Sequence, residues 1–96
     1  MLETLAVTDF TPLLNASVQF HAANAEFALT LVEAALMNQP SPRPAPAFRL
    51  IFRSPERYRL PQGVYALVHP THGALEVMMV PIQPDAQGAL FEVIFN

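Results

Sequence analysis

The sequence predicts a mainly β domain, with about six antiparallel strands curled into a small barrel or roll after a short N-terminal helix. Two observations lead to this class. Short apolar runs recur along the chain with turn residues between them, and most of the runs alternate with period two. The connections are short, as in antiparallel sheets. Because 96 residues fit one core, we expect a single domain over residues 1–96.

The first elements lie before residue 23. In "VTDFTPLLN" a single helical turn can be capped by Thr8, or alternatively by Thr11 with Pro12 at the first helical position. In "SVQFHA" (17–22), Val18 and Phe20 share one side, which predicts a strand.

Residues 26–36 leave two alternatives open. Their Ala, Leu and Glu content favours a helix by propensity. Phe27, Leu29 and Leu31 nevertheless alternate with Ala28, Thr30 and Val32, which is the period of a strand.

The clearest break in the chain is "QPSPRPAPA" (39–47). Four prolines in seven residues exclude helix interiors and sheet ladders, and favour an extended polyproline conformation. We expect a stiff surface loop here, with a ligand for a proline-recognising groove as the alternative.

Four strand-like runs follow, and their regular spacing predicts an antiparallel meander. They cover residues 47–53, 63–69, 74–80 and 89–95, with residues 81–88 expected to be a turn region. Alternation assigns inward faces to the outer two runs. These faces are Phe48, Leu50 and Phe52 in the first run, and Phe91, Val93 and Phe95 in the last.

The two central runs are apolar on both faces. Tyr65 and Leu67 oppose one set of apolar residues, as do Leu75, Val77 and Met79. The chain is 52% hydrophobic and only 14% charged, more apolar than one small core can hide. We therefore predict an interface with a second copy or another protein on the second face, at Val64, Ala66, Val68, Met78 and Val80.

Charge is distributed unevenly along the chain. All five Arg lie between residues 43 and 59, where only Glu56 opposes them, and the other seven carboxylates lie outside this segment. A basic patch is therefore predicted at Arg49, Arg53, Arg57 and Arg59. We expect it to pair with the acidic remainder and not with nucleic acid, because the net charge is −3 and stacking aromatics are not interleaved with the Arg residues.

Common catalytic equipment is missing from the sequence. Without Cys there is no thiol nucleophile or thiolate metal site, and no glycine-rich phosphate loop is present. His69 and His72 could share a metal but lack a patterned third ligand, so we expect them to be polar turn residues. We therefore expect no cofactor, no metal site and no catalytic residue, and hence no enzyme.

No apolar stretch is long enough for a membrane span. The N-terminus carries Glu3 and Asp9 and no basic residue, so a signal peptide is not expected. These features predict cytoplasmic synthesis, with incorporation into a larger assembly as an option.

The C-terminal half, "LPQGVYALVHPTHGALEVMMVPIQPDAQGALFEVIFN", resembles a family of small uncharacterised bacterial proteins, domain of unknown function 6916. The matching positions are Leu60-Pro61-Gln62-Gly63, Tyr65, His69, Gly73, Val80-Pro81, Phe91-Glu92 and Phe95-Asn96; Asp9-Phe10 and "FRLIFR" also fit. Asn15-Ala16 departs from the family pattern. The resemblance implies a strand over residues 26–36 and carries no catalytic residue. It also implies gene neighbourhoods with phage-tail-collar-type fibre proteins, which suggests an assembly role.

Three functional hypotheses follow. The first is a non-catalytic structural or interaction module that self-associates, or docks on a tail-fibre-like partner, through an apolar strand face. The alternative is a small-ligand-binding β-barrel, in which the apolar strands surround a ligand. A weaker alternative is a metal-dependent enzyme around the His-Pro-Thr-His turn.

Overall fold

A computed structural model describes residues 4–23, 25–38, 42–54 and 60–96. Two single-turn 3-10 helices come first, η2 (Val7–Asp9) and η3 (Thr11–Leu13), so the expected N-terminal helix is divided at Phe10. Neither has a side-chain cap at its N-cap position, so neither Thr8 nor Thr11 caps a helix as the sequence suggested. Six strands follow: β1 (Ser17–Ala22), β2 (Ala25–Leu36), β3 (Phe48–Ser54), β4 (Gly63–His69), β5 (Gly73–Asp85) and β6 (Gly88–Phe95).

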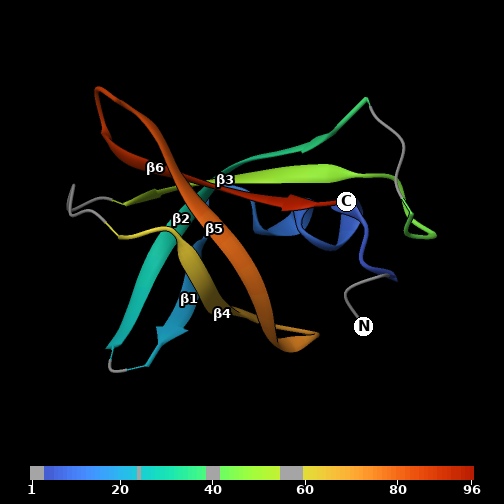
Figure 1. The fold of residues 1–96 in the computed structure, drawn as a ribbon, viewed down its shortest axis with the longest axis horizontal. Coiled ribbons are helices and arrows are strands. Elements are labelled where there is room, and N and C mark those ends of the chain that lie inside the picture. Colours follow the sequence, from blue (N-terminus) through green and yellow to red (C-terminus); the bar gives the residue numbers. More distant parts are fainter. Residues whose placement is uncertain (1–3, 24, 39–41, 55–59) are drawn as a thin grey trace.

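The six strands close into an antiparallel barrel, which confirms the predicted fold class (Figure 1). The order around the barrel is β1-β2-β3-β6-β5-β4, and β4 closes it by pairing with β1. The simple meander expected for the last four strands is therefore wrong. β3 pairs with β6 and not with β4, because the chain after β3 crosses to the far side of the β4–β5–β6 meander, as in a Greek key.

Residues 26–36 form a strand and not a helix. β2 pairs with β1 through Phe20↔Phe27 and with β3 through Leu31↔Phe52. The register with β3 shifts between Leu31 and Glu33, which places a bulge at Val32. Before the bulge the odd-numbered residues face inward, and after it Ala34 packs against the core.

β5 is longer than expected and runs on through Pro81 to Asp85. The pairing of Pro81 with Phe91 keeps this segment in the sheet, so the predicted turn region shrinks to the residues between Asp85 and Gly88. β4 begins only at Gly63, opposite Met79, and beyond that point no described strand pairs with this edge of β5. Proline is tolerated on such an edge because it has no N–H to contribute to a ladder.

Side chains fill the interior of the barrel, as expected for so few strands. The inward residues predicted for β3 and β6 are all buried, and so are Tyr65, Leu67, Leu75, Val77 and Met79 of the central hairpin. Phe10 is fully buried and closes one end, with its ring centroid 5.7 Å from that of Phe48 and 5.5 Å from that of Phe95. The N-terminal 3-10 helices and the C-terminus lie toward this end (Figure 1).

The proline-rich connection before β3 lies at the same end (Figure 1). Residues 42–45 form successive bends, so the straight polyproline conformation expected from the sequence is not adopted there. The cause is Arg43, whose guanidinium donates to the carbonyl oxygens of Leu5 (2.7 Å) and Pro46 (2.9 Å) and curls the segment around itself.

Candidate functional site

The apolar outer face of β4 and β5 lies on the surface of the barrel. We call Val64, Ala66, Val68, Met78 and Val80 together the β4–β5 outer face. Val64 and Met78 are paired across the two strands and are 60% and 51% exposed. The other three side chains are partly exposed. Alternation along the strands explains this placement. The residues that alternate with the outer face point into the core, and they include Tyr65, Leu67, Val77 and Met79.

The sequence prediction did not include one neighbouring apolar residue. Ile94 of β6 is 42% exposed. Val93 and Met79 are register partners in antiparallel strands. Ile94, which follows Val93, therefore lies beside Met78, which precedes Met79. Ile94 thus continues the apolar surface onto a third strand. The period-two alternation of the last run could have identified Ile94, because it points opposite to Phe95. Glu76, which pairs with Ala66, lies within this surface, and Glu92, the register partner of Val80, borders it.

The two described residues of the predicted basic patch, Arg49 and Arg53, both form ion pairs. Arg49 of β3 lies between Glu33 of β2 and Glu92 of β6, with N–O distances of 2.8 Å and 3.4 Å. The side-chain hydrogen bond to Glu33 raises the pKa of Arg49 above its ordinary value. Arg53 bonds to Asp85, and that bond lowers the pKa of the Asp85 carboxyl.

These pairs divide the wall of the barrel into two unlike sides. The β2–β3–β6 side carries alternating charges, whereas the β4–β5 side is mostly apolar and carries Glu76. The charges of Arg49 and Arg53 are thus compensated within the molecule, as the sequence led us to expect. Arg57 and Arg59, the other two predicted members of the patch, lie outside the described residues.

His69 is a buried structural residue, only 5% exposed. Its Nδ1 accepts hydrogen bonds from the backbone amides of Thr71 (3.0 Å) and His72 (3.3 Å). Its proton therefore resides on Nε2, which donates to the carbonyl oxygen of Asp9 at 2.7 Å. Phe10 meets the ring edge-on, with centroids 5.1 Å apart. His69 thus joins the β4–β5 turn to the N-terminal segment and has both nitrogens occupied.

His72 contributes to the same link. Its Nε2 lies 3.2 Å from Oδ1 of Asp9, while Oδ2 of Asp9 accepts a hydrogen bond from the Ala6 amide at 2.8 Å. The hydrogen bond from the Ala6 amide is the main cause that lowers the pKa of Asp9. Partial desolvation acts in the opposite direction, and His72 lowers the pKa further. We call Asp9, His69 and His72 the histidine latch. Among the described residues, no group of three or more His, Asp or Glu has the arrangement of a metal site.

The sequence singled out the two histidines but missed their partner. Nothing in the sequence pattern links Asp9 to a turn about sixty residues later. Only closure of the barrel brings them together.

None of the helices among the described residues has the length and hydropathy of a membrane span. Ser54 is fully buried at the end of β3, and its hydroxyl has no hydrogen-bond partner among the described residues.

Comparison with known proteins gives one match. A search of curated proteins and a search of solved structures both find nothing similar. A family model described as "Domain of unknown function (DUF6916)" matches residues 5–95, which includes every strand of the barrel and both 3-10 helices. The resemblance seen in the sequence is thereby confirmed over almost the whole chain: this protein belongs to the DUF6916 family.

Proposed function

We propose that this domain is a non-catalytic interaction module that associates with a second copy of itself through the β4–β5 outer face. The observation that carries the proposal is the exposed Val64–Met78 pair, continued by Ile94 on β6. Large apolar side chains that lie next to one another on a surface are typical of a protein interface.

The closed barrel limits how such a module can associate. A sheet with open edges can recruit a further strand by backbone hydrogen bonding, but here each strand has two neighbours in the barrel, with the part of β5 beyond Met79 as a local exception. Association must then rely mainly on side-chain faces. The β2–β3–β6 side is ill suited to this, because Arg49, Glu33 and Glu92 would lose water on burial.

The required area is modest for a molecule of this size. A standard interface buries about 800 Å² per partner, roughly one seventh of the 5579 Å² accessible surface of the chain. The β4–β5 outer face offers a largely apolar surface for such a contact, with Glu76 within it opposite Ala66 and Glu92 at its border beside Val80. The same face could instead receive a tail-fibre-like protein, which the experiment below separates from self-association.

The ligand-binding barrel receives no comparable support. The interior positions of the strands are occupied by core side chains, including Phe20, Phe52 and Phe91. For the enzyme alternative, the bonds of His69 to backbone groups leave its ring nitrogens committed to the fold.

The test is sedimentation velocity from about 10 μM to 1 mM. We expect the wild-type chain to form dimers, and the double variant Val64→Glu/Met78→Glu to associate at least tenfold more weakly, because each charge would have to be desolvated. Leu36→Glu is the matched control, since Leu36 is 62% exposed on β2 and should not affect the contact. A monomeric wild type at 1 mM would disprove self-association; a pull-down with a neighbouring fibre protein that depends on Val64 and Met78 would then favour docking.

A further inference from the structure

One carboxylate differs from all the others in the described part of the chain. Of the eight Asp and Glu residues, six are among the described residues, and five of these six lie beside a basic side chain. The pairs are Asp9 with His72, Glu26 with His21, Glu33 and Glu92 with Arg49, and Asp85 with Arg53. Glu76 of β5 has no such partner among the described residues.

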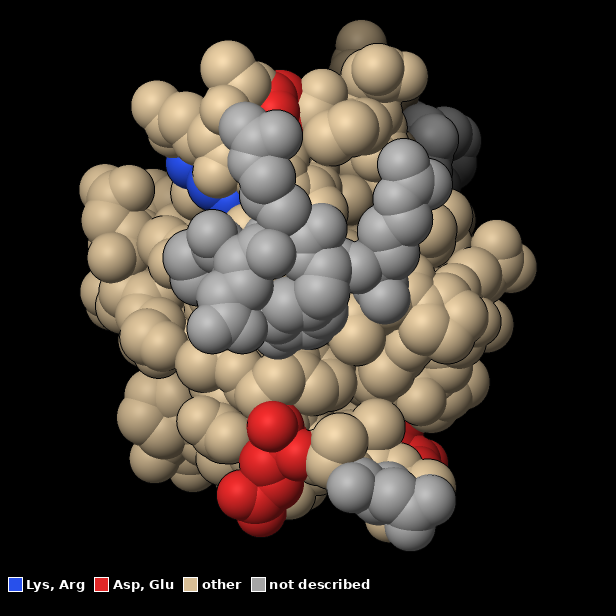
Figure 2. Space-filling model, turned by 90° about the vertical axis from the view of Figure 1, so that its left-hand side faces the viewer, with Lys and Arg blue, Asp and Glu red and all other residues tan. Residues whose placement is uncertain are grey.

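The surroundings of Glu76 are apolar. Ala66 lies across from it on β4, and Ala74 and Met78 flank it on the same face of β5. It is three residues nearer to the β4–β5 turn than Met79, which pairs with the first residue of β4. Charged side chains are sparse elsewhere too, and on the side that Figure 2 shows the visible ones lie toward the upper and lower margins. The unpaired charge of Glu76 thus lies within the β4–β5 outer face.

A contact that covers the Val64–Met78 pair also covers Glu76. Two residues along a strand are about 7 Å apart, whereas a standard interface of about 800 Å² per partner is roughly 30 Å across. Glu76 is exposed in the single chain and would lose its water in the contact. A carboxylate buried without a cation takes up a proton instead of remaining charged.

Two other titratable groups adjoin this face. His21 of β1 is the register partner of Ala66 on the side away from Glu76, and its Nδ1 lies 3.4 Å from Oε1 of Glu26. Glu92 of β6 is the register partner of Val80, and its Oε2 lies 3.4 Å from a guanidinium nitrogen of Arg49. Both groups are paired within their own chain, so Glu76 is the described residue of this face that pays an uncompensated cost of desolvation.

We propose that the protonation state of Glu76 controls self-association through the β4–β5 outer face. This inference rests on the function proposed above and adds its regulation. The charged carboxylate opposes the contact, and the neutral carboxyl permits it. Since Glu76 is charged in the single chain and neutral in the contact, association takes up protons and strengthens as the pH falls.

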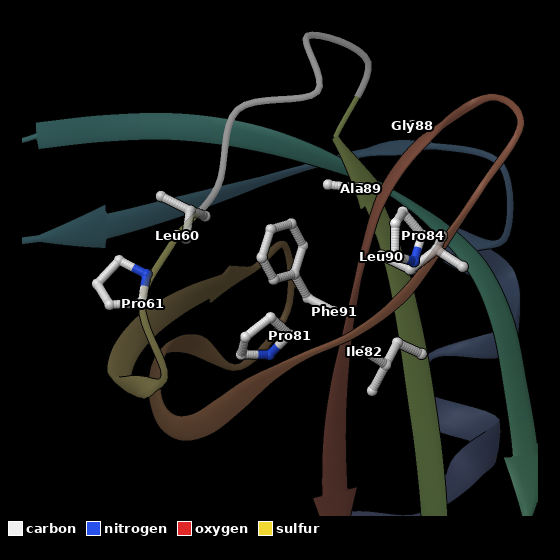
Figure 3. A pocket seen from close by; sticks show the side chains of 9 residues that line it. All are labelled: Leu60, Pro61, Pro81, Ile82, Pro84, Gly88, Ala89, Leu90 and Phe91. Carbon is white, nitrogen blue, oxygen red and sulfur yellow. The ribbon is translucent and has the colours of Figure 1, made fainter.

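Glu76 is separate from the pocket beside the β5–β6 hairpin. That pocket is lined by β5 only from Pro81 onward, together with residues such as Leu60 and Phe91 (Figure 3). A substitution at Glu76 therefore tests the outer face and leaves the pocket unchanged.

The experiment is sedimentation velocity of the full chain at pH 7.5 and pH 5.0, from about 10 μM to 1 mM. The wild type should associate at least tenfold more tightly at pH 5.0. Glu76→Gln should associate at least tenfold more tightly than the wild type at pH 7.5, and equally at both pH values, because the amide carries no charge. Glu33→Gln is the matched control on the β2–β3–β6 side and should behave as the wild type. Both side chains are at the surface, so both variants should fold, as checked by circular dichroism.

His21→Gln separates the two groups that gain a proton on acidification. If Glu76 is the sensor, this variant keeps the acid response of the wild type; loss of the response would assign it to His21 and overturn the inference. Association that is the same at both pH values, and unchanged or weakened in Glu76→Gln, would also overturn it while self-association stands. A wild type and a Glu76→Gln variant that are both monomeric at 1 mM at both pH values would instead disprove the self-association itself.

Discussion

His69 and Asp9 show how single residues hold the N-terminal segment to the barrel. The bonds of His69 to Thr71, His72 and the Asp9 carbonyl fix the proton of the ring on Nε2. The Asp9 carboxylate accepts from the Ala6 amide on one oxygen and faces His72 with the other. Asp9 therefore contributes both a hydrogen-bond acceptor and a negative charge to the histidine latch. Different substitutions can remove the charge alone or both together.

Removal of the Asp9 carboxylate should give a pH-dependent loss of stability. A carboxyl with a lowered pKa stabilises the fold above its unfolded-state pKa, and this contribution is lost as the pH falls through the folded-state value. Asp9→Ala should cost about 1 kcal/mol near pH 7, the usual value of a capping interaction, and the difference from the wild type should shrink as the pH falls through the lowered folded-state pKa of Asp9.

Asp9→Asn is the matched control, because an amide oxygen can still accept from Ala6 but does not titrate. Its stability should lie between those of the wild type and Asp9→Ala, with a smaller pH dependence. Urea unfolding followed at several pH values measures all three. A gap between wild type and Asp9→Ala that stays constant from pH 7 to pH 2.5 would contradict the assigned role of the charge.

At the scale of elements, β2 shows what sequence patterns can and cannot determine. The bulge at Val32 reverses which residues face inward, so Leu29, Leu31 and Ala34 all meet the core. Their spacing of two and then three residues mixes the periods of a strand and a helix. The sequence alone therefore left both alternatives open, and pairing with β1 and β3 is what makes the segment a strand.

Straight strands were easier to predict. In β3, β4 and β6, uninterrupted alternation correctly assigned the inward residues, because a side chain in an extended strand has only two directions. Strand order was harder. The pairing of β1 with β4 and of β3 with β6 joins partners 35 to 49 residues apart, and no local pattern encodes it. The extension of β5 past the start of β4 was missed for the same reason.

The two glycine turns of the β4–β5–β6 meander should differ in their tolerance to substitution. Both glycines have positive φ, +76° at Gly73 and +151° at Gly88. A Cβ on Gly73 would meet no atom within 4 Å, whereas one on Gly88 would lie 2.4 Å from the backbone oxygen of Ser54 on β3. Gly88→Ala should therefore cost about 3 kcal/mol or more, and Gly73→Ala about 1 kcal/mol.

Chemical denaturation of the two alanine variants measures this difference. Gly73→Ala serves as the control, because it carries the backbone strain without the steric overlap. Equal losses of stability would mean that β3 and the β5–β6 hairpin separate easily at Ser54.

At the scale of the whole molecule, the barrel presents four different surfaces. One side of its wall is mostly apolar, the other carries ion pairs, and the two ends differ from each other. The N-terminal 3-10 helices lie at one end, whereas the projecting β5–β6 hairpin lies toward the other (Figure 1).

This arrangement requires the N-terminal segment to be part of the cooperative fold. Phe10 is fully buried against Phe48, Phe95 and His69, although it lies in a segment without regular strand pairing. Phe10→Ala should cost about 3–5 kcal/mol, the range for truncating a buried phenylalanine. That is a large part of the roughly 5–15 kcal/mol that stabilises a typical domain. Leu14→Ala, at a residue 38% exposed in the same segment, should cost less than about 1 kcal/mol.

Thermal unfolding and amide exchange of both variants provide the measurement. If the end-closing segment folds with the barrel, Phe10→Ala will increase exchange in β3 and β6 as well as near residue 10; an increase confined to residues 5–14 would show instead that the segment opens independently of the barrel.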